Sequence, residues 1–212
     1  MKKLIYSLAL LSFMASCQSG PEGETSEAGE KQEAAVSTSG TTYRFDNSSS
    51  SLTFVGTKPV GTHTGLITLT DGNLQVENGN ITAGKFNINL SSMQIKDADT
   101  NGAYKLVGHL LSPDFFDVAK YPNASFEITA CEVLTNDSTG THKITGNLTL
   151  KDSTKNISFP AKVNITETDL FATADFIIDR TQWGLHYGND KSLKDKFIYP
   201  EVKIMLNIDA KK

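Results

Sequence analysis

The chain has 212 residues, a formal net charge of -4 and a hydrophobic content of 38%. The weakly acidic balance argues against a nucleic-acid partner, because phosphate binding needs a basic surface. No run of 18 apolar residues suggests a membrane-spanning helix, and two cysteines are too few for a disulfide framework or a cysteine-based zinc site. One exported domain with polar extensions fits what remains.

Residues 1–16 have the features of a bacterial lipoprotein signal peptide. Lysines at positions 2 and 3 precede a short apolar run that ends at Met14. Ala15 and Ser16 then stand directly before Cys17, as small residues do in a lipobox, although Met14 replaces the usual leucine. We therefore expect Cys17 to be lipidated and to become the mature N-terminus. The alternative is an ordinary signal peptide that is cleaved elsewhere, with Cys17 incidental.

Residues 17–42 are expected to form an acidic, flexible tether behind the lipidated cysteine. Positions 18–42 contain five glutamates, one lysine (Lys31) and no aromatic residue, Leu, Ile or Met. Such a segment buries too little apolar surface to offset the entropy of ordering it. As a coil of 25 residues it would span roughly 25–30 Å on average.

Residues 43–212 carry the pattern of an antiparallel β domain. Apolar and polar residues alternate along most segments, as in Phe86, Ile88 and Leu90 between polar neighbours. Turn signals such as Asp71-Gly72 separate the segments, and short links favour antiparallel pairing of neighbours. Long consecutive strands with one apolar face favour a closed barrel. The predicted strands cover 43–46, 52–57, 65–71, 73–77, 80–90, 124–134, 142–150, 155–166, 169–179 and 201–210. A bulge is predicted at Gly84.

One segment breaks the β pattern. Leu106, Val107, Leu110 and Leu111 fall at helical spacing, and Pro113 should end that helix. The Ser112-Pro113 pair would suit the start of a second helix. We expect this segment to plug or cover one end of the barrel, with ordinary core closure as an equal alternative.

No catalytic or metal-binding motif is present. The four histidines show no HxxH or HExxH spacing, and there is no nucleophile elbow, P-loop or dinucleotide-binding motif. A metal site assembled through the fold from His63, His109 and His186 is a weak alternative. If Cys17 carries lipid, Cys131 has no disulfide partner, and a thiol on a strand is more often a packing residue than a nucleophile.

Several sequence blocks resemble the YceI-like family of lipid- and polyisoprenoid-binding proteins. They occur in family order from residue 43 to residue 210 and include the blocks at 105–118, 144–160 and 179–188, together with Phe54-Val55-Gly56-Thr57-Lys58 and Gly61-Thr62-His63-Thr64-Gly65. The resemblance implies a lipocalin-like antiparallel barrel of about eight strands, with adjacent predicted segments merging into single bent strands. It also implies a long apolar ligand, such as a polyprenyl chain or an isoprenoid quinone, and no cofactor beyond that ligand.

On this hypothesis the barrel lumen removes the isoprenoid chain from water, and polar groups at the mouth select the head group. The alternating runs place eight apolar residues on the inner face: Phe86, Ile88, Phe126, Ile128, Phe176, Ile178, Ile204 and Leu206. Four motif positions are candidates for the mouth: Lys58, His63, His109 and Arg180. Side chains can also fill a small barrel completely, and the pattern does not separate these two cases.

The leading hypothesis is therefore a non-enzymatic lipid-binding protein, anchored in a bacterial cell-envelope membrane through Cys17 and facing the periplasm or the cell surface. The main alternative is a packed barrel that serves as an envelope interaction or stress-response module without a ligand. A third alternative is an enzyme acting on a lipid head group, favoured only if His109 and Asp114 converge on a pocket. The resemblance also allows a homodimer.

Overall fold

A computed structural model describes residues 20–212, so the predicted signal peptide and Cys17 lie outside the described residues. The described chain forms nine strands: β1 (Thr41–Phe45), β2 (Ser51–Lys58), β3 (Gly61–Glu77), β4 (Asn80–Ile95), β5 (Asn123–Val133), β6 (His142–Leu150), β7 (Ser153–Ile165), β8 (Asp169–Asp179) and β9 (Glu201–Lys211). One α-helix, α1 (Thr100–Leu111), and two 3-10 segments, η1 (Arg180–Trp183) and η2 (Lys191–Lys196), complete the structure.

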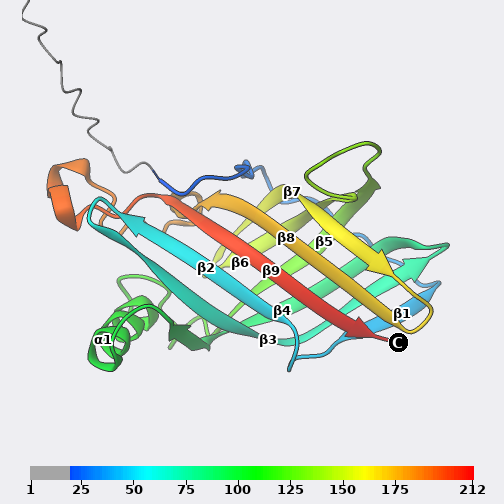
Figure 1. Cartoon of the computed structure of the whole chain (residues 1–212), viewed down its shortest axis with the longest axis horizontal. Helices are drawn as coiled ribbons and strands as arrows, with labels where there is room; N and C mark the ends of the chain where they lie inside the picture. The colour runs from blue at the N-terminus through cyan, green and yellow to red at the C-terminus, as the bar shows by residue number, and fades with distance from the viewer. Residues whose placement is uncertain (1–19) are drawn as a thin grey trace, which may run out of the picture.

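The strands close into an antiparallel barrel with eight strand positions. The sheet order is β3-β2-β9-β8-β7-β6-β5-β4, and β3 pairs with β4 to close it. β1 continues the position of β2: β3 pairs with β2 along its first half and with β1 near its end, and β1 also contacts the end of β9. The predicted barrel class is therefore confirmed (Figure 1).

β3 shows why the sequence suggests more segments than the barrel contains. The predicted strands 65–71 and 73–77 form one strand, which passes through Gly72 with irregular pairing on either side. The bulge predicted at Gly84 is wrong in position, because Gly84 pairs with Leu74 and the extra residue in this part of β4 is Thr82. Gly84 instead provides space, since a Cβ there would lie 2.6 Å from a methyl carbon of Leu74.

The predicted helix is present and begins earlier than its apolar residues suggest. The Asp99 side chain caps α1 by accepting a hydrogen bond from the Gly102 amide, at 2.6 Å. The helix ends at Leu111, as Pro113 predicts. The second helix predicted at Ser112 is wrong: the carbonyl of Ser112 accepts from the amides of Phe115 and Asp117, and this closes turns instead.

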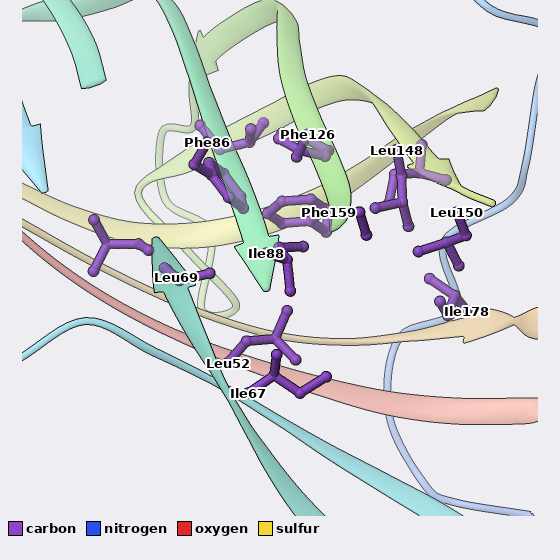
Figure 2. Close-up of a cluster of buried hydrophobic side chains, with 14 of the residues drawn as sticks. Leu52, Ile67, Leu69, Phe86, Ile88, Phe126, Leu148, Leu150, Phe159 and Ile178 are labelled. Atoms are coloured by element: carbon purple, nitrogen blue, oxygen red, sulfur yellow. The ribbon is translucent and has the colours of Figure 1, made fainter. Parts of the chain in front are cut away.

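A row of phenylalanine rings crosses the middle of the barrel. Successive ring centroids are 5.5 Å, 5.3 Å, 5.6 Å and 4.0 Å apart along the row Phe45, Phe86, Phe126, Phe159 and Phe176. The last pair is stacked almost parallel. These rings come from β1, β4, β5, β7 and β8, and we call them the aromatic floor. Figure 2 shows three of them beside the leucines and isoleucines of the surrounding strands.

Residues 20–35, which we call the strap, lie along the outside of the barrel. Ser26 and Glu24 exchange backbone hydrogen bonds with Ile177 of β8, and Gly29 exchanges two with Asn156 of β7. The strap then reaches β6 and β5, where the Ala35 amide donates to the Ile128 carbonyl. In Figure 1 the strap runs in blue along one side of the barrel, from the end near η2 toward the end near the C-terminus.

The flexible tether predicted for 17–42 is therefore wrong for the strap. The prediction from composition considers only how much apolar surface the segment can bury. The strap is held instead by hydrogen bonds to polar groups on the outer face of the barrel. Asn147 is only 2% exposed; its side chain accepts from the Gln32 amide at 3.0 Å and donates to the Gln32 carbonyl at 2.7 Å. Because a buried amide that lacks partners is costly, these contacts favour the bound strap.

Candidate ligand cavity

The half of the barrel near α1 encloses an apolar cavity of about 500 Å³. This volume lies in the range of small-molecule binding pockets. Besides residues predicted from the sequence, its walls include Leu52, Phe54, Ile67, Leu90, Met93, Leu106, Leu110, Phe115, Phe116, Ala124, Leu148, Leu150, Ile157 and Phe159. The barrel interior is therefore partly hollow, and the fully packed alternative does not describe it.

The aromatic floor bounds the cavity on the side of the C-terminus. Phe86, Phe126 and Phe159 line both the large cavity and a second one of about 50 Å³ on the other side of the floor. Gly146 makes room for one of these rings, since a Cβ at that position would lie 2.3 Å from Cζ of Phe126. The floor thus separates a hollow half of the barrel from a packed half.

Seven of the eight residues predicted for the lumen line the large cavity. They are Phe86, Ile88, Phe126, Phe176, Ile178, Ile204 and Leu206. The eighth, Ile128, lies beyond the floor and lines the small cavity. Its alternation correctly places it on the inner face, but alternation gives no position along the barrel axis.

Three chain segments form the rim of the mouth. The end of β2 contributes Lys58, helix α1 contributes His109, and the segment 184–199 contributes Tyr187 and Lys196. The rings of His109 and Tyr187 meet edge to face with centroids 4.4 Å apart, which joins α1 to the segment 184–199. The helix predicted to cover one barrel end does so as part of the cavity wall.

Arg180 holds the segment 184–199 in place. It is 3% exposed, and its guanidinium donates to the carbonyls of Leu185, Tyr187 at 2.9 Å and Ile198 at 3.0 Å. Burial lowers the pKa of this guanidinium, while the carboxylates of Asp179 and Glu201 oppose that shift. Arg180 borders the cavity, as the sequence predicts for a mouth residue, but most of its donors are committed to shaping the rim.

Two polar atoms at the mouth have no hydrogen-bond partner. The hydroxyl of Thr57 is buried and makes no hydrogen bond. Nδ1 of His63 is also buried without a hydrogen bond, and it lies 3.6 Å from Oδ2 of Asp97, within ion-pair distance. Both residues line the cavity. Because each of these atoms is covered by protein, a side-chain rotation would have to expose it before it could bind the polar end of a ligand. Thr57 is absent from the predicted site, although it immediately precedes the predicted Lys58.

The histidines do not assemble a reactive centre. Nε2 of His109 lies 3.8 Å from Oδ2 of Asp114, but Asp114 does not line the cavity. Across residues 20–212, no three His, Cys, Asp or Glu side chains gather closely enough to hold a metal ion. Burial raises the pKa of the Cys131 thiol to about 11, so the thiol is protonated near neutral pH, as a packing residue would be.

These features define a class of protein: an antiparallel barrel with eight strand positions, an apolar cavity open at one end and a few polar groups at its mouth. Within that class, the YceI-like domain model matches residues 43–210, and the chain belongs to this family. In residues 20–212 no helix is long and apolar enough to cross a membrane.

Relatives with similar sequences share part of the domain. The chain is 36% identical over 93 residues to Protein YceI from Escherichia coli and 38% identical over 93 residues to a UPF0312 protein from Pseudomonas aeruginosa. Each match covers 44% of this chain and 44% of the relative. The matched region thus spans less than half the length of these curated relatives.

Solved structures share the fold over more of the chain. BcnA from Burkholderia cenocepacia has a TM-score of 0.63 at 17% identity, covering 78% of this chain and 98% of BcnA. A polyisoprenoid binding domain from Saccharophagus degradans has a TM-score of 0.59 at 16% identity, covering 80% of this chain and 97% of that domain. At these identities the likeness supports the fold.

Proposed function

We propose that this protein binds a long apolar isoprenoid lipid, such as a polyprenyl chain or an isoprenoid quinone, without catalysing a reaction. The observation that carries the proposal is the apolar cavity of about 500 Å³ inside the barrel. Apolar walls favour a hydrocarbon chain because its burial removes apolar surface from water. The polyisoprenoid binding domain among the structural neighbours supports the same ligand class.

The mouth would hold the polar head group of this lipid. Four polar residues border this opening: Thr57, Lys58, His63 and His109. A quinone carbonyl or a prenyl hydroxyl can accept a hydrogen bond from such groups. The isoprenoid tail would then lie along the cavity, with its far end against the aromatic floor.

Native mass spectrometry of the purified protein, before and after organic extraction, tests the proposal. We expect a co-purifying prenyl lipid that extraction removes and an added prenyl quinone restores. Ile204→Trp should fill the cavity and prevent this restoration, because Ile204 lines the wall. Phe171→Trp is the matched control, since Phe171 is exposed and borders neither cavity. Equal restoration in both variants would contradict binding in the cavity.

We further propose that Cys17 carries the membrane anchor and that the domain faces the periplasm or the cell surface. The support is the run of small residues before Cys17 in the sequence. Multiple acyl chains anchor a protein stably, whereas one chain does so only marginally. Cys17→Ser should abolish fatty-acid labelling and membrane association and leave the domain folded. Unchanged labelling and membrane association in this variant would contradict the anchor.

A further inference from the structure

We infer that the open end of the barrel is a lipid-docking surface, which the strap holds against the membrane that carries the anchor. This inference rests on the proposed anchor and lipid ligand. It concerns the orientation of the open end of the cavity relative to the bilayer, which neither of those proposals specifies. The partner is the surface of a lipid bilayer, and three features of the molecule point to it: the position of Gly20 beside β9, the attachment of the strap, and the residues that surround the mouth.

Gly20, three residues after Cys17, lies at the mouth end of the barrel. Gly20 lies against the side chain of Glu201, the first residue of β9. This is the mouth end of the barrel, because Val202 and Ile204 just beyond it line the cavity. Three residue steps separate Cys17 from Gly20 and span at most about 11 Å when fully extended. An anchor at Cys17 therefore keeps the mouth end close to the bilayer.

The second observation is that the strap, by binding to the barrel, shortens the free chain between Cys17 and the domain. A free coil over residues 18–42 would hold the domain roughly 25–30 Å away and leave its orientation undefined. The strap instead contacts β8, β7, β6 and β5 in turn through Ser26, Gly29, Gln32 and Ala35. It also covers Ile177, an outward-facing residue of β8 that is only 2% exposed.

The third observation is the set of exposed apolar side chains around the mouth. Val60 in the β2–β3 turn is 67% exposed, Tyr104 of α1 is 80% exposed and Leu193 of η2 is 42% exposed. Single exposed apolar residues are ordinary, and Val133 and Phe171 are exposed away from the mouth; these three, however, belong to neighbouring elements at one end of the barrel (Figure 1). Aromatic and aliphatic side chains of this kind are suited to enter the interfacial region of a bilayer.

Charge is a minor contributor to this surface. The segment 190–196 around Leu193 contains three lysines and two aspartates, leaving one net positive charge. We therefore expect docking to depend on the anchor and on apolar contact, and to vary little with salt or with anionic lipid.

The two ends of the barrel cannot contact the bilayer together when its axis is upright. The 11 residues of β9 extend about 35 Å along the strand, which at the usual tilt of barrel strands separates the two ends by about 25–30 Å along the axis. A mouth that faces the bilayer would let an isoprenoid chain move between membrane and cavity without crossing open water. This geometry suits extraction and return of a membrane lipid.

Tryptophan quenching by brominated phospholipids can measure which end touches the bilayer. Leu193→Trp reports the mouth, and Glu167→Trp in the β7–β8 turn reports the opposite end; buried Trp183 gives the same background in both. Full-length protein from membranes is reconstituted in zwitterionic vesicles. If its Cys17 carries no natural lipid, the chain beginning at Cys17 is coupled through that thiol to a maleimide phospholipid, with Cys131→Ser preventing a second attachment. We expect severalfold stronger quenching at position 193 than at position 167.

A strap-release variant tests the role of the strap. Ser26→Pro with Gly29→Pro removes two amides that donate to the barrel. Glu27→Pro with Lys31→Pro is the matched control, because neither residue makes a hydrogen bond or an ion pair to the barrel, whereas Glu30 pairs with Lys155 of β7. In the strap-release variant, tryptophan quenching should become equal at positions 193 and 167. In the control variant, quenching should stay stronger at position 193.

The outcomes separate this inference from the proposed function. Equal quenching at both ends in the protein with an intact strap overturns the inference, even if a prenyl lipid is bound. An unchanged difference in the strap-release variant overturns the role of the strap. Stronger quenching at position 193 without any bound lipid supports the docking surface and contradicts the proposed ligand.

Discussion

The two halves of the barrel share most of their strands and the same alternation, yet one is hollow and the other is packed. On the mouth side of the aromatic floor the walls surround a cavity of about 500 Å³, whereas the far side leaves only about 50 Å³. The far half gains β1, whose Tyr43 is buried and donates its hydroxyl hydrogen to the Thr166 carbonyl at 2.7 Å. The mouth half is covered by α1 and the segment 184–199.

The barrel fold alone does not determine how much of its interior is filled with side chains. The aromatic floor determines which half is packed. The rings at the centre provide most of the barrier, and two glycines allow them to pack there. A Cβ at Gly72 would lie 2.6 Å from the ring of Phe45 and 2.8 Å from Cβ of Phe86, so that position accepts no larger residue without rearrangement. The cavity therefore begins on the mouth side of these packed rings.

Removing one ring of the floor should have the largest effect. Phe126→Ala would join the two cavities, because Phe126 lines both. We expect a loss of about 3–5 kcal/mol in the free energy of unfolding, as for other buried phenylalanines. Mass spectrometry should also show a shift toward longer bound isoprenoid chains. A stability loss with an unchanged chain-length profile would show that the floor does not limit the ligand. Phe176→Ala, which opens only the large cavity, is the companion variant.

Shortening a side chain to alanine should lower the free energy of unfolding more in the packed half of the barrel than in the hollow half. Leu170 in the packed half is fully buried and lines neither cavity, so Leu170→Ala should cost about 2–5 kcal/mol. Ile204 lines the hollow half and is half-buried, so Ile204→Ala should cost about 1–2 kcal/mol, near the ordinary range. Chemical denaturation of ligand-free protein measures both values. Equal costs would indicate that both halves are equally packed.

Removing the strap should affect stability but leave ligand affinity unchanged. A chain beginning at residue 38 lacks the strap contacts, so the Asn147 side chain loses Gln32 and the Asn156 backbone loses Gly29, and both then meet water. We expect a loss of about 1–2 kcal/mol, because a few net hydrogen bonds are offset by the regained entropy of the strap. Affinity for a prenyl quinone should match that of a chain beginning at Gln18, since the strap lies outside the barrel. A tenfold weaker affinity would show that the strap shapes the cavity.

The smallest effect should come from one hydroxyl at the mouth. Thr57→Val keeps the side-chain shape and removes an unpaired polar atom, so ligand-free stability should hold or rise slightly. If that hydroxyl donates to the head group, quinone affinity should fall about tenfold, the equivalent of about 1.4 kcal/mol. Titration calorimetry measures this change, and Thr53→Val outside the cavity lining is the control. Equal affinities in the two variants would place the head group elsewhere.

The alternation of residues predicts the inner face well and the arrangement along the axis poorly. It places Phe86, Phe126 and Phe176 inside, as the structure confirms. It equally places Ile128 inside but does not show that this residue lies beyond the floor. The side-chain period of a strand is two wherever the residue stands, so depth becomes known only with the strand register.

The two features that the sequence predicts wrongly, the bulge at Gly84 and the flexible tether, both depend on contacts with residues that are distant in the sequence. Gly84 was expected to form a bulge, although its absent Cβ serves contacts with Leu74 and Ile128 on neighbouring strands. The strap was expected to be a coil, because its composition lacks apolar residues. Its partners Asn147 and Asn156 lie more than a hundred residues away and resemble ordinary polar outer-face residues in the sequence.

By itself, the sequence determined the antiparallel barrel, the position of its helix, the inner face of its strands and its family blocks, because these follow from local periodicity and motifs. Only the tertiary structure decided that the barrel is hollow at one end, that Thr57 and His63 meet at its mouth and that the strap is bound outside. Each of these depends on which residues meet across strands, and that pairing is set by register and closure rather than by any single segment of the chain.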